Sequence, residues 1–219
     1  MLSNLFIVDV FVKGGPVMVP ILLCSIIGVA IMIERARFYL RQNSGTEKFM
    51  AHVRSALAAR DYLEALRMCR METHPLARVI AAGIDRLDLP KDALLDVMRQ
   101  EAMRQMKHFE KNTGILSTIA TVSPLLGLTG TVTGMISSFS IISTIGVGDP
   151  TALAGGISEA LYTTAAGLFI GIPALVAFNW CESRIKEFEE QVEYYSLDLA
   201  NNLALSSVAP EANREKAAA

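Results

Sequence analysis

Residues 112–148 read NTGILSTIATVSPLLGLTGTVTGMISSFSIISTIGVG, a run of 37 residues without a charged side chain. Two more uncharged runs lie on either side of it: 20 residues from Gly14 to Ile33, and 22 residues from Ala160 to Cys181. The hydrocarbon core of a bilayer is about 30 Å thick, and a helix needs about 20 apolar residues to cross it. We therefore predict an all-α integral membrane protein with three transmembrane helices, at residues 14–33, 112–147 and 157–181.

The composition of the whole chain supports this class and excludes several others. Of 219 residues, 52% are hydrophobic and 19% are charged, and the mean hydropathy is +0.37. Lys and Arg number 20 and Asp and Glu 22, so no basic excess is available to bind nucleic acid. The three cysteines are far apart, which excludes a disulfide framework. The histidines His52, His74 and His108 all lie outside the uncharged runs, which excludes a catalytic Ser–His pair in the membrane. We predict no enzymatic activity, no cofactor and no metal.

Basic residues indicate the orientation. Lys13 is the only basic residue outside the stretches 34–111 and 181–219, and basic flanks stay on the cytoplasmic side. The N-terminus is then periplasmic and the C-terminus cytoplasmic. Outside the spans we predict an outer interfacial segment at residues 1–13, a cytoplasmic helical domain at 34–111 and a periplasmic loop at 148–156. A cytoplasmic helix at 182–208 and a disordered tail at 209–219 follow the third span.

Apolar residues at helical spacing predict helices in both cytoplasmic parts. Breaks are expected at residues 43–45, 73–75 and 89–90, where Asn, Gly and Pro gather. The apolar series from Leu95 to Phe109 runs toward the second span, and the series from Ile185 to Leu199 runs on from the third. We therefore expect two of the membrane helices to extend into the cytoplasm as amphipathic helices.

The three spans differ in kind. The first is apolar on all sides and is typical of an anchor, whereas the second and third contain many small and hydroxylated residues. In lipid such residues mark close helix packing or a polar path, and both interpretations are open. Two prolines inside helices predict hinges or tolerated kinks. The packing or kink residues are Pro124, Gly127, Gly130, Gly134, Gly167, Gly171 and Pro173.

Glu159 is the one ionisable side chain within the apolar part of the second and third spans. A carboxylate in hydrocarbon costs a few kcal/mol, so the default interpretation is a functional group that faces a cavity. Counted from Glu182, Glu159 lies about 35 Å from the inner edge, which leaves a position at the wet outer mouth as the alternative. The same count puts Thr164 at about 27 Å, and Thr131 at about 30 Å from Lys111.

Residues 123–135 (SPLLGLTGTVTGM) and 156–168 (GISEALYTTAAGL), with Ile172-Pro173-Ala174 and Asn179, resemble the ExbB/TolQ/MotA family of proton-channel subunits, ExbB most of all. The resemblance implies a pentamer in the bacterial inner membrane, around two helices of an ExbD- or TolR-type partner whose single Asp binds the proton. A TonB- or TolA-type transducer would receive the work. By motif, Thr131, Thr164 and Glu159 match the proton pathway, and Thr163 is an additional hydroxyl.

The chemistry of the spans agrees with that resemblance. A lone carboxyl cannot relay a proton through about 30 Å of hydrocarbon, so a partner has to supply another acid. The leading hypothesis is a motor subunit that uses the proton motive force to energise TonB-dependent outer-membrane transport. The alternatives are a TolQ-like subunit for envelope integrity, another force-generating system, or a non-conducting scaffold. The choice between H⁺ and Na⁺ is also open, although few oxygen ligands favour H⁺.

Overall fold

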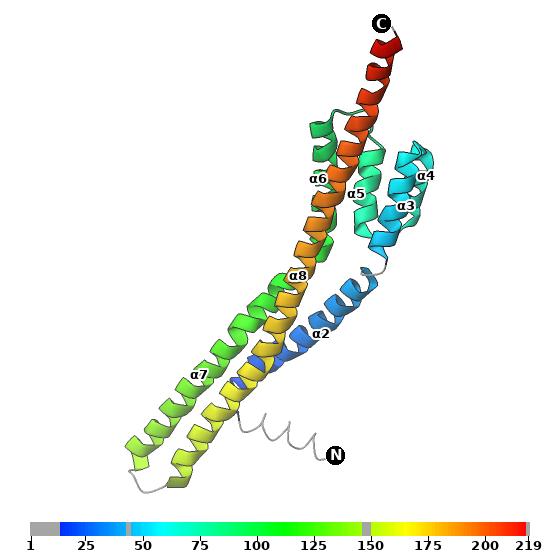
Figure 1. The fold of residues 1–219 in the computed structure, drawn as a ribbon. Helices are drawn as coiled ribbons and strands as arrows, with labels where there is room; N and C mark the ends of the chain where they lie inside the picture. The colour runs from blue at the N-terminus through cyan, green and yellow to red at the C-terminus, as the bar shows by residue number, and fades with distance from the viewer. Residues whose placement is uncertain (1–13, 43–44, 146–149, 218–219) are drawn as a thin grey trace. The chain divides into compact units, whose positions relative to one another are not determined.

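The computed structural model describes residues 14–42, 45–145 and 150–217, and every regular element in these ranges is a helix (Figure 1). The predicted all-α class is confirmed. The predicted outer segment 1–13 lies outside the described residues, as do residues 146–149. The elements are α2 (Met18–Gln42), α3 (Thr46–Ala58), α4 (Tyr62–Met71), α5 (Pro75–Ile84), α6 (Lys91–Phe109), α7 (Thr113–Ile145) and α8 (Pro150–Ala217).

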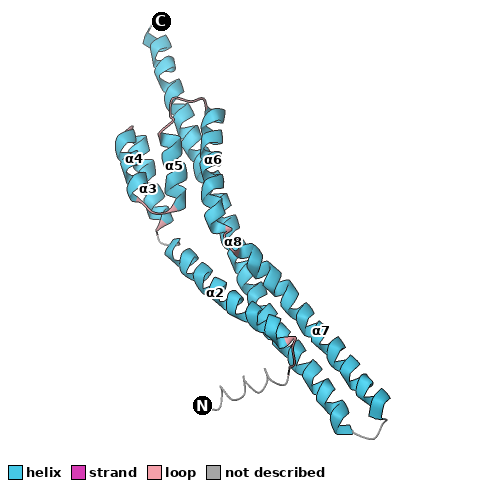
Figure 2. Cartoon of the chain, turned by 180° about the vertical axis from the view of Figure 1, so that it is seen from behind, coloured by secondary structure: helices cyan, strands magenta, loops and turns pink. Residues whose placement is uncertain are grey.

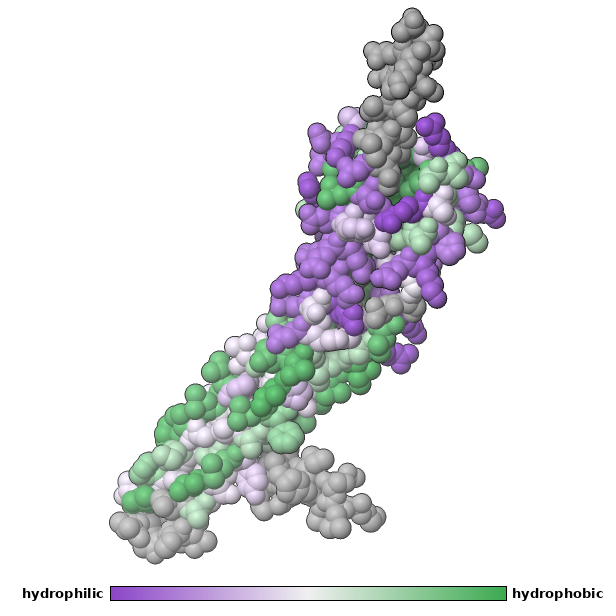
Figure 3. Space-filling model, viewed as in Figure 1, coloured by the Kyte–Doolittle hydropathy of each residue, from purple (hydrophilic) through white to green (hydrophobic). Residues whose placement is uncertain are grey.

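The chain forms two compact units. The membrane unit comprises Met1–Arg37 and Asn112–Glu182, and the hydrophilic unit comprises Phe38–Lys111 and Ser183–Ala219. Helices α2, α7 and α8 are each long and apolar enough to cross a bilayer, with hydropathies of 2.0, 1.6 and 1.8 over their most apolar windows. Figure 3 shows the same division in the hydrophobic colouring of α2, α7 and the first part of α8. The three predicted membrane helices are confirmed.

The membrane unit is built on an antiparallel pair. Helix α7 and the first part of α8 run side by side in both views (Figures 1 and 2). A small core joins α7 and α8 through Ile119, Ala120 and Ala174, and Cys24 of α2 packs against it. Gly28 of α2 also faces the side chain of Ile119. Helix α2 therefore packs on the α7–α8 pair along one face and leaves its other apolar side chains exposed for lipid.

The hydrophilic unit has a conventional apolar core. Its helices α3 to α6 and the second part of α8 bury Val53, Ala65, Cys69, Leu76, Ile80, Leu94, Met98, Phe188 and Leu199. The rings of Phe109 and Phe188 stack at 4.2 Å between centroids. The breaks predicted at residues 73–75 and 89–90 agree with the starts of α5 at Pro75 and of α6 at Lys91. A further break at residues 59–61, where Arg60 has φ 61°, was not predicted.

Three predicted boundaries differ from the structure. Helix α2 begins at Met18 instead of residue 14, because Gly15 adopts φ +67°. Residues 150–156 were predicted as loop, but they belong to α8, where Pro150 suits the first turn and Gly156 packs on α7. Helix α8 continues through Ala217, so it also covers most of the stretch that was predicted as a tail.

The predicted continuity of residues 95–109 into the second span is wrong. Helix α6 ends at Phe109 and α7 begins at Thr113, with Asn112 at φ 62° between them. Asn tolerates this left-handed conformation, and its side-chain amide donates a hydrogen bond to Glu34 at 2.8 Å. Apolar spacing does not reveal such a break, because the interruption takes only three residues.

Candidate functional site

Glycines bring α7 and α8 into backbone contact at successive levels. A Cβ at Gly167 would lie 2.5 Å from the carbonyl oxygen of Ser123, and one at Gly127 would lie 3.0 Å from the Thr164 Cα. Neither neighbour can move without moving its helix. Glycine at these positions therefore sets the close approach of the two helices.

The same contact continues toward both ends of the pair. At Gly134 a Cβ would lie 2.7 Å from the carbonyl oxygen of Gly156, and at Gly171 it would lie 2.7 Å from the ring of Pro124. Pro173 is exposed on another face of α8. Helices α7 and α8 run on through their prolines as single elements. The hinge or kink role of the prolines stays a prediction.

Thr164 lies at this helix contact and joins the two helices directly. Its hydroxyl donates a hydrogen bond to the carbonyl oxygen of Gly127 at 3.0 Å. The side chain is half-buried. Once its hydrogen is used in this way, the Thr164 oxygen can still accept a hydrogen bond from another group.

Thr163 is placed differently from its neighbour. It is only 1% exposed and packs against Gly130, where even a Cβ would collide with its side chain. Its hydroxyl donates within α8, to the carbonyl oxygens of Ala160 at 2.9 Å and Glu159 at 3.2 Å. In the single chain, Thr163 is therefore a packing residue that reaches no open surface.

Thr131 follows Gly130 on α7 and is half-buried. Its hydroxyl donates to the Leu128 carbonyl at 2.6 Å. The pairings Gly127 with Thr164 and Gly130 with Thr163 place Thr131 about one helical turn from the level of Thr164. Thr131 and Thr164 thus lie on the two helices at neighbouring levels, each with its donor already used.

Other α7 hydroxyls share this pattern of bonding. Each donates to a carbonyl one turn back in its own helix, at 2.9 to 3.1 Å, as observed for Thr118, Thr121, Thr129, Thr133 and Ser138. A hydroxyl bonded in this way presents oxygen lone pairs outward. The exposed hydroxyls of α7 therefore form a series of hydrogen-bond acceptors.

Glu159 is half-buried one turn before Thr163 on α8. Its carboxylate lies against Gly15, in the turn that precedes α2. This neighbour came from a distant part of the sequence and was not predicted. The pore-lining role of Thr131, Glu159, Thr163 and Thr164 stays a prediction, because the single chain shows their positions without a pore.

Ala160, Thr164, Gly167, Gly171 and Ala174 form a small-residue series on one side of α8, and its first member, Ala160, packs on Gly134. Sequence reasoning missed the continuation of this contact at Gly156, which faces Ser138. The spacing could have revealed it, since Gly156 lies four residues before Ala160. Ser123 is fully buried, and its hydroxyl has no hydrogen-bond partner among the described residues.

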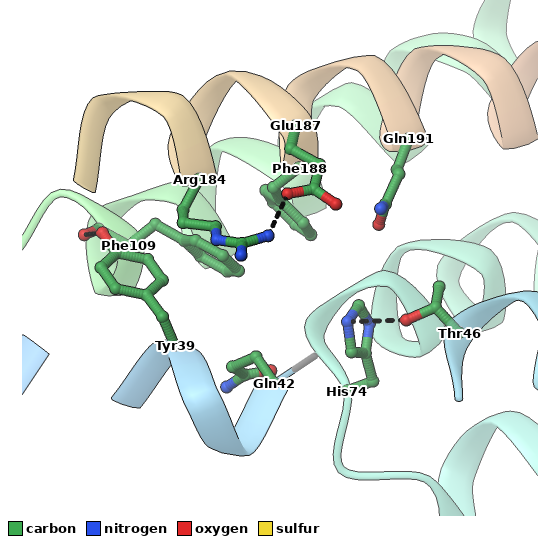
Figure 4. A pocket seen from close by; sticks show the side chains of 9 residues that line it. All are labelled: Tyr39, Gln42, Thr46, His74, Phe109, Arg184, Glu187, Phe188 and Gln191. Atoms are coloured by element: carbon green, nitrogen blue, oxygen red, sulfur yellow. Dashed lines mark hydrogen bonds and ion pairs between the residues drawn. The ribbon is translucent and has the colours of Figure 1, made fainter. Parts of the chain in front are cut away.

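The hydrophilic unit contains a small polar pocket of its own (Figure 4). Its volume is about 40 Å³, enough for water or a small ion. The His74 ring lies 3.2 Å from the Thr46 hydroxyl, and Arg184 pairs with Glu187 at 2.6 Å. Burial lowers the pKa of His74 below its ordinary value, while Glu72 and a backbone hydrogen bond with Gln42 act in the opposite direction. Within the described ranges, no three His, Cys, Asp or Glu side chains gather into a metal site.

Comparisons with known proteins show which family the chain resembles in sequence. A model of the MotA/TolQ/ExbB proton channel family matches residues 71–194, which include α7 and the α8 residues Glu159 to Thr164. The chain is 34% identical over 177 residues to biopolymer transport protein ExbB-like 1 of Synechocystis sp., covering 79% of this chain and 69% of that protein. It is 29% identical over 205 residues to biopolymer transport protein ExbB of Neisseria meningitidis, covering 87% and 93%.

The Tol-Pal system protein TolQ of Haemophilus influenzae is also similar, at 29% identity over 205 residues, covering 87% of this chain and 90% of TolQ. The matches to these relatives extend well beyond the two motifs, since they cover 79–87% of this chain. On the family match and the similarity over most of the chain, this protein belongs to the MotA/TolQ/ExbB proton channel family.

Proposed function

We propose that the chain is the ring-forming subunit of a proton-driven motor of the ExbB–ExbD type. Five copies would surround the membrane helices of a single-span partner that carries an Asp. The N-terminus would be periplasmic and the C-terminus cytoplasmic, in the bacterial inner membrane. The observation that carries the proposal is the acceptor character of the hydroxyls at Thr131 and Thr164, whose donors bind backbone carbonyls.

Acceptor oxygens distinguish the two forms of an acid. A protonated carboxyl donates a hydrogen bond to such an oxygen, whereas a carboxylate finds no donor there. The hydroxyls therefore favour the neutral acid, which crosses a low-dielectric region at far lower cost than the ion. A partner Asp beside Thr131 and Thr164 would lose its charge when it takes up a proton. It could then move along the inner surface of the proposed ring. This chemistry suits H⁺ better than Na⁺.

Glu159 would serve as the entry acid of the pathway. Asp149 and Glu159 are the only charged residues between positions 112 and 181, so the chain supplies no complete proton relay of its own. Each proton that crosses releases about 2.3 kcal/mol per 100 mV of membrane potential. We propose that this energy moves the ring against its partner and is passed to a TonB-type transducer for outer-membrane transport.

Proton flux in proteoliposomes tests the pore residues. The chain, purified together with the Asp-bearing partner, is reconstituted, and flux is driven by a potassium diffusion potential and followed with an internal pH dye. Thr164→Val, Thr131→Val and Glu159→Gln should each lower the flux by about tenfold, the effect of losing about 1.4 kcal/mol at the barrier. Thr118→Val removes a hydroxyl that, like that of Thr131, bonds within α7, but it lies about 20 Å along the helix from Thr131 and should leave flux unchanged.

The outcome separates a channel from a scaffold. If all three variants assemble with the partner and conduct like the unchanged protein, then the hydroxyls and Glu159 serve packing only and the proposal is wrong. Replacing internal and external Na⁺ by choline should leave the flux unaltered. A flux that requires Na⁺ would contradict the assignment to protons.

The process that receives the work is tested in cells. In a strain that lacks the ExbB–ExbD pair, expression of this chain with its partner should restore TonB-dependent uptake. In a strain that lacks the TolQ–TolR pair, the same expression should leave the envelope defect uncorrected. The opposite result would support the TolQ-like alternative, which the similarity to TolQ of Haemophilus influenzae favours.

A further inference from the structure

The turn before α2 has a conformation that favours glycine. Gly15 adopts φ +67°, a left-handed region that other residues seldom enter. Its carbonyl oxygen accepts a hydrogen bond from the Met18 amide at 3.1 Å, and the Pro16 carbonyl accepts one from the Val19 amide at 3.2 Å. The turn is therefore tied to the first turn of α2.

The Glu159 carboxylate occupies the space beside this turn. A Cβ at Gly15 would collide with Oε1 of Glu159 and would lie 2.8 Å from its carboxyl carbon. At Gly45, which also has a positive φ, a Cβ would meet nothing within 4 Å. Gly15 thus meets two separate requirements, the backbone conformation and the room for Glu159, whereas Gly45 meets only the first.

The start of α2 is also a favourable place for a carboxylate. The turn already bonds the Met18 and Val19 amides and Pro20 has no amide hydrogen, so what remains there for a carboxylate is the helix dipole, which is positive at this end.

We propose that Gly15 is a positioning residue for Glu159, and that the first membrane helix takes part in the proton pathway by seating this carboxyl group. The proposal rests on the role of Glu159 in the function proposed above. It adds that α2, whose composition is that of an anchor, determines where the carboxyl group lies between proton transfers.

A double-mutant cycle in the reconstituted complex tests the contact. Gly15→Ala should displace the Glu159 carboxyl group and lower proton flux by on the order of tenfold. Glu159→Asp shortens the side chain by one methylene and withdraws the carboxyl group from position 15. In the Gly15→Ala background, Glu159→Asp should therefore restore flux. The flux of the double variant should differ by about threefold or more from the value expected if the two single effects simply multiplied.

Gly45→Ala is the matched control, because it introduces the same positive-φ strain into open space. It should leave flux unchanged and show no coupling to Glu159→Asp. A second measurement follows the carboxyl group itself: labelling of Glu159 by a hydrophobic carbodiimide, quantified by mass spectrometry, should change in Gly15→Ala and not in Gly45→Ala. This readout remains available if Gly15→Ala abolishes flux.

The outcomes separate the two proposals. If Glu159→Gln conducts normally, the role of Glu159 in the pathway is wrong. If Glu159→Gln blocks flux while Gly15→Ala and Glu159→Asp act additively, and Gly15→Ala leaves the labelling of Glu159 unchanged, Glu159 functions without the contact to Gly15. The role assigned to Gly15 is then overturned.

Discussion

At the scale of single residues, His74 shows how one side chain joins two helices. Its Nδ1 accepts a hydrogen bond from the Leu76 amide at 3.2 Å and thereby caps α5. The proton of the neutral ring is then on Nε2, which lies 3.2 Å from the Thr46 hydroxyl at the start of α3. Protonation of Nδ1 would remove the acceptor that the cap requires. The neutral ring is therefore the form that the fold uses, in agreement with the pKa of His74, which burial lowers.

The hydrophilic unit should therefore lose stability in acid. Because the folded protein binds a proton at His74 less readily than the unfolded chain, the stabilisation is present above pH 6.5 and is lost as the pH falls below it. His74→Asn keeps a capping side chain without a titrating ring, so its melting temperature should depend less on pH. Thermal unfolding in detergent between about pH 5 and 8 measures this.

The exposed His52, which contacts the Lys48 carbonyl in its own helix, supplies the control. His52→Asn should retain the pH dependence of the unchanged protein. Equal pH dependence in His74→Asn and the unchanged protein would contradict the role of His74.

At the scale of elements, the α7–α8 pair depends on the alignment of small residues on both helices. Gly127, Gly130 and Gly134 on α7 face Thr164, Thr163 and Ala160 on α8. There is little hydrophobic drive between helices in lipid, so close packing and the hydrogen bond from Thr164 to the Gly127 carbonyl hold the pair together. Packing and a polar face coexist here, because hydroxyls such as that of Thr131 bond to a carbonyl of their own helix, while that of Thr164 bonds to a carbonyl of the facing helix.

Gly167→Ala should weaken this pair. The added Cβ would lie 2.5 Å from the Ser123 carbonyl oxygen, which is backbone and cannot turn away. We expect the free energy of unfolding to fall by about 1–3 kcal/mol, the usual range for overpacking. Unfolding of the detergent-solubilised protein in increasing dodecyl sulfate, followed by circular dichroism, provides the measurement.

Gly114→Ala is the control within α7, since a Cβ there has open space. It should be neutral, or stabilising by up to about 1 kcal/mol through helix propensity. A loss of stability equal to that of Gly167→Ala would mean that the contact distances at Gly167 do not determine the effect.

At the scale of the whole molecule, α8 contributes to the cores of both units. Its first part packs on α7, and its second part buries Phe188 and Leu199 in the hydrophilic unit. Asp198 forms an ion pair with Arg54 at 2.9 Å, and Asn201 accepts a hydrogen bond from Lys91 at 2.7 Å. The hydrophilic unit is therefore completed by a segment that follows the third membrane helix in the chain.

Truncation after Glu182 should unfold the hydrophilic unit while the membrane helices remain inserted. The loss of Phe188 and Leu199 removes apolar burial of about 1.5–3 kcal/mol for each side chain, a large share of the 5–15 kcal/mol that stabilises a typical domain. Truncation after Asn201 keeps every contact named above and should preserve the unit. Limited proteolysis of the two truncated proteins in detergent measures the difference, and equal resistance would refute the contribution of α8.

Much of this architecture could be predicted from the order of residues alone. The three membrane helices follow from uncharged runs, because an uncharged helix of about 20 residues has few alternatives to the bilayer. The starts of α5 and α6 follow from Pro75 and Pro90, since proline lacks the amide that a helix interior needs. Gly167 and Gly171 were named from the sequence as packing or kink residues, and at both of them a Cβ would meet α7.

What the sequence by itself determined is therefore periodic or local: the class, the spans, several helix ends and the residues that carry hydroxyls or a carboxyl group. Only the tertiary structure decided that Thr163 is enclosed while Thr164 bonds to the Gly127 carbonyl, although the two are adjacent and identical. Only it brought Glu159 against Gly15, 144 positions earlier in the chain. The physical reason is that helical spacing records which side of one helix is apolar, whereas a contact between helices depends on the rotation and depth of both.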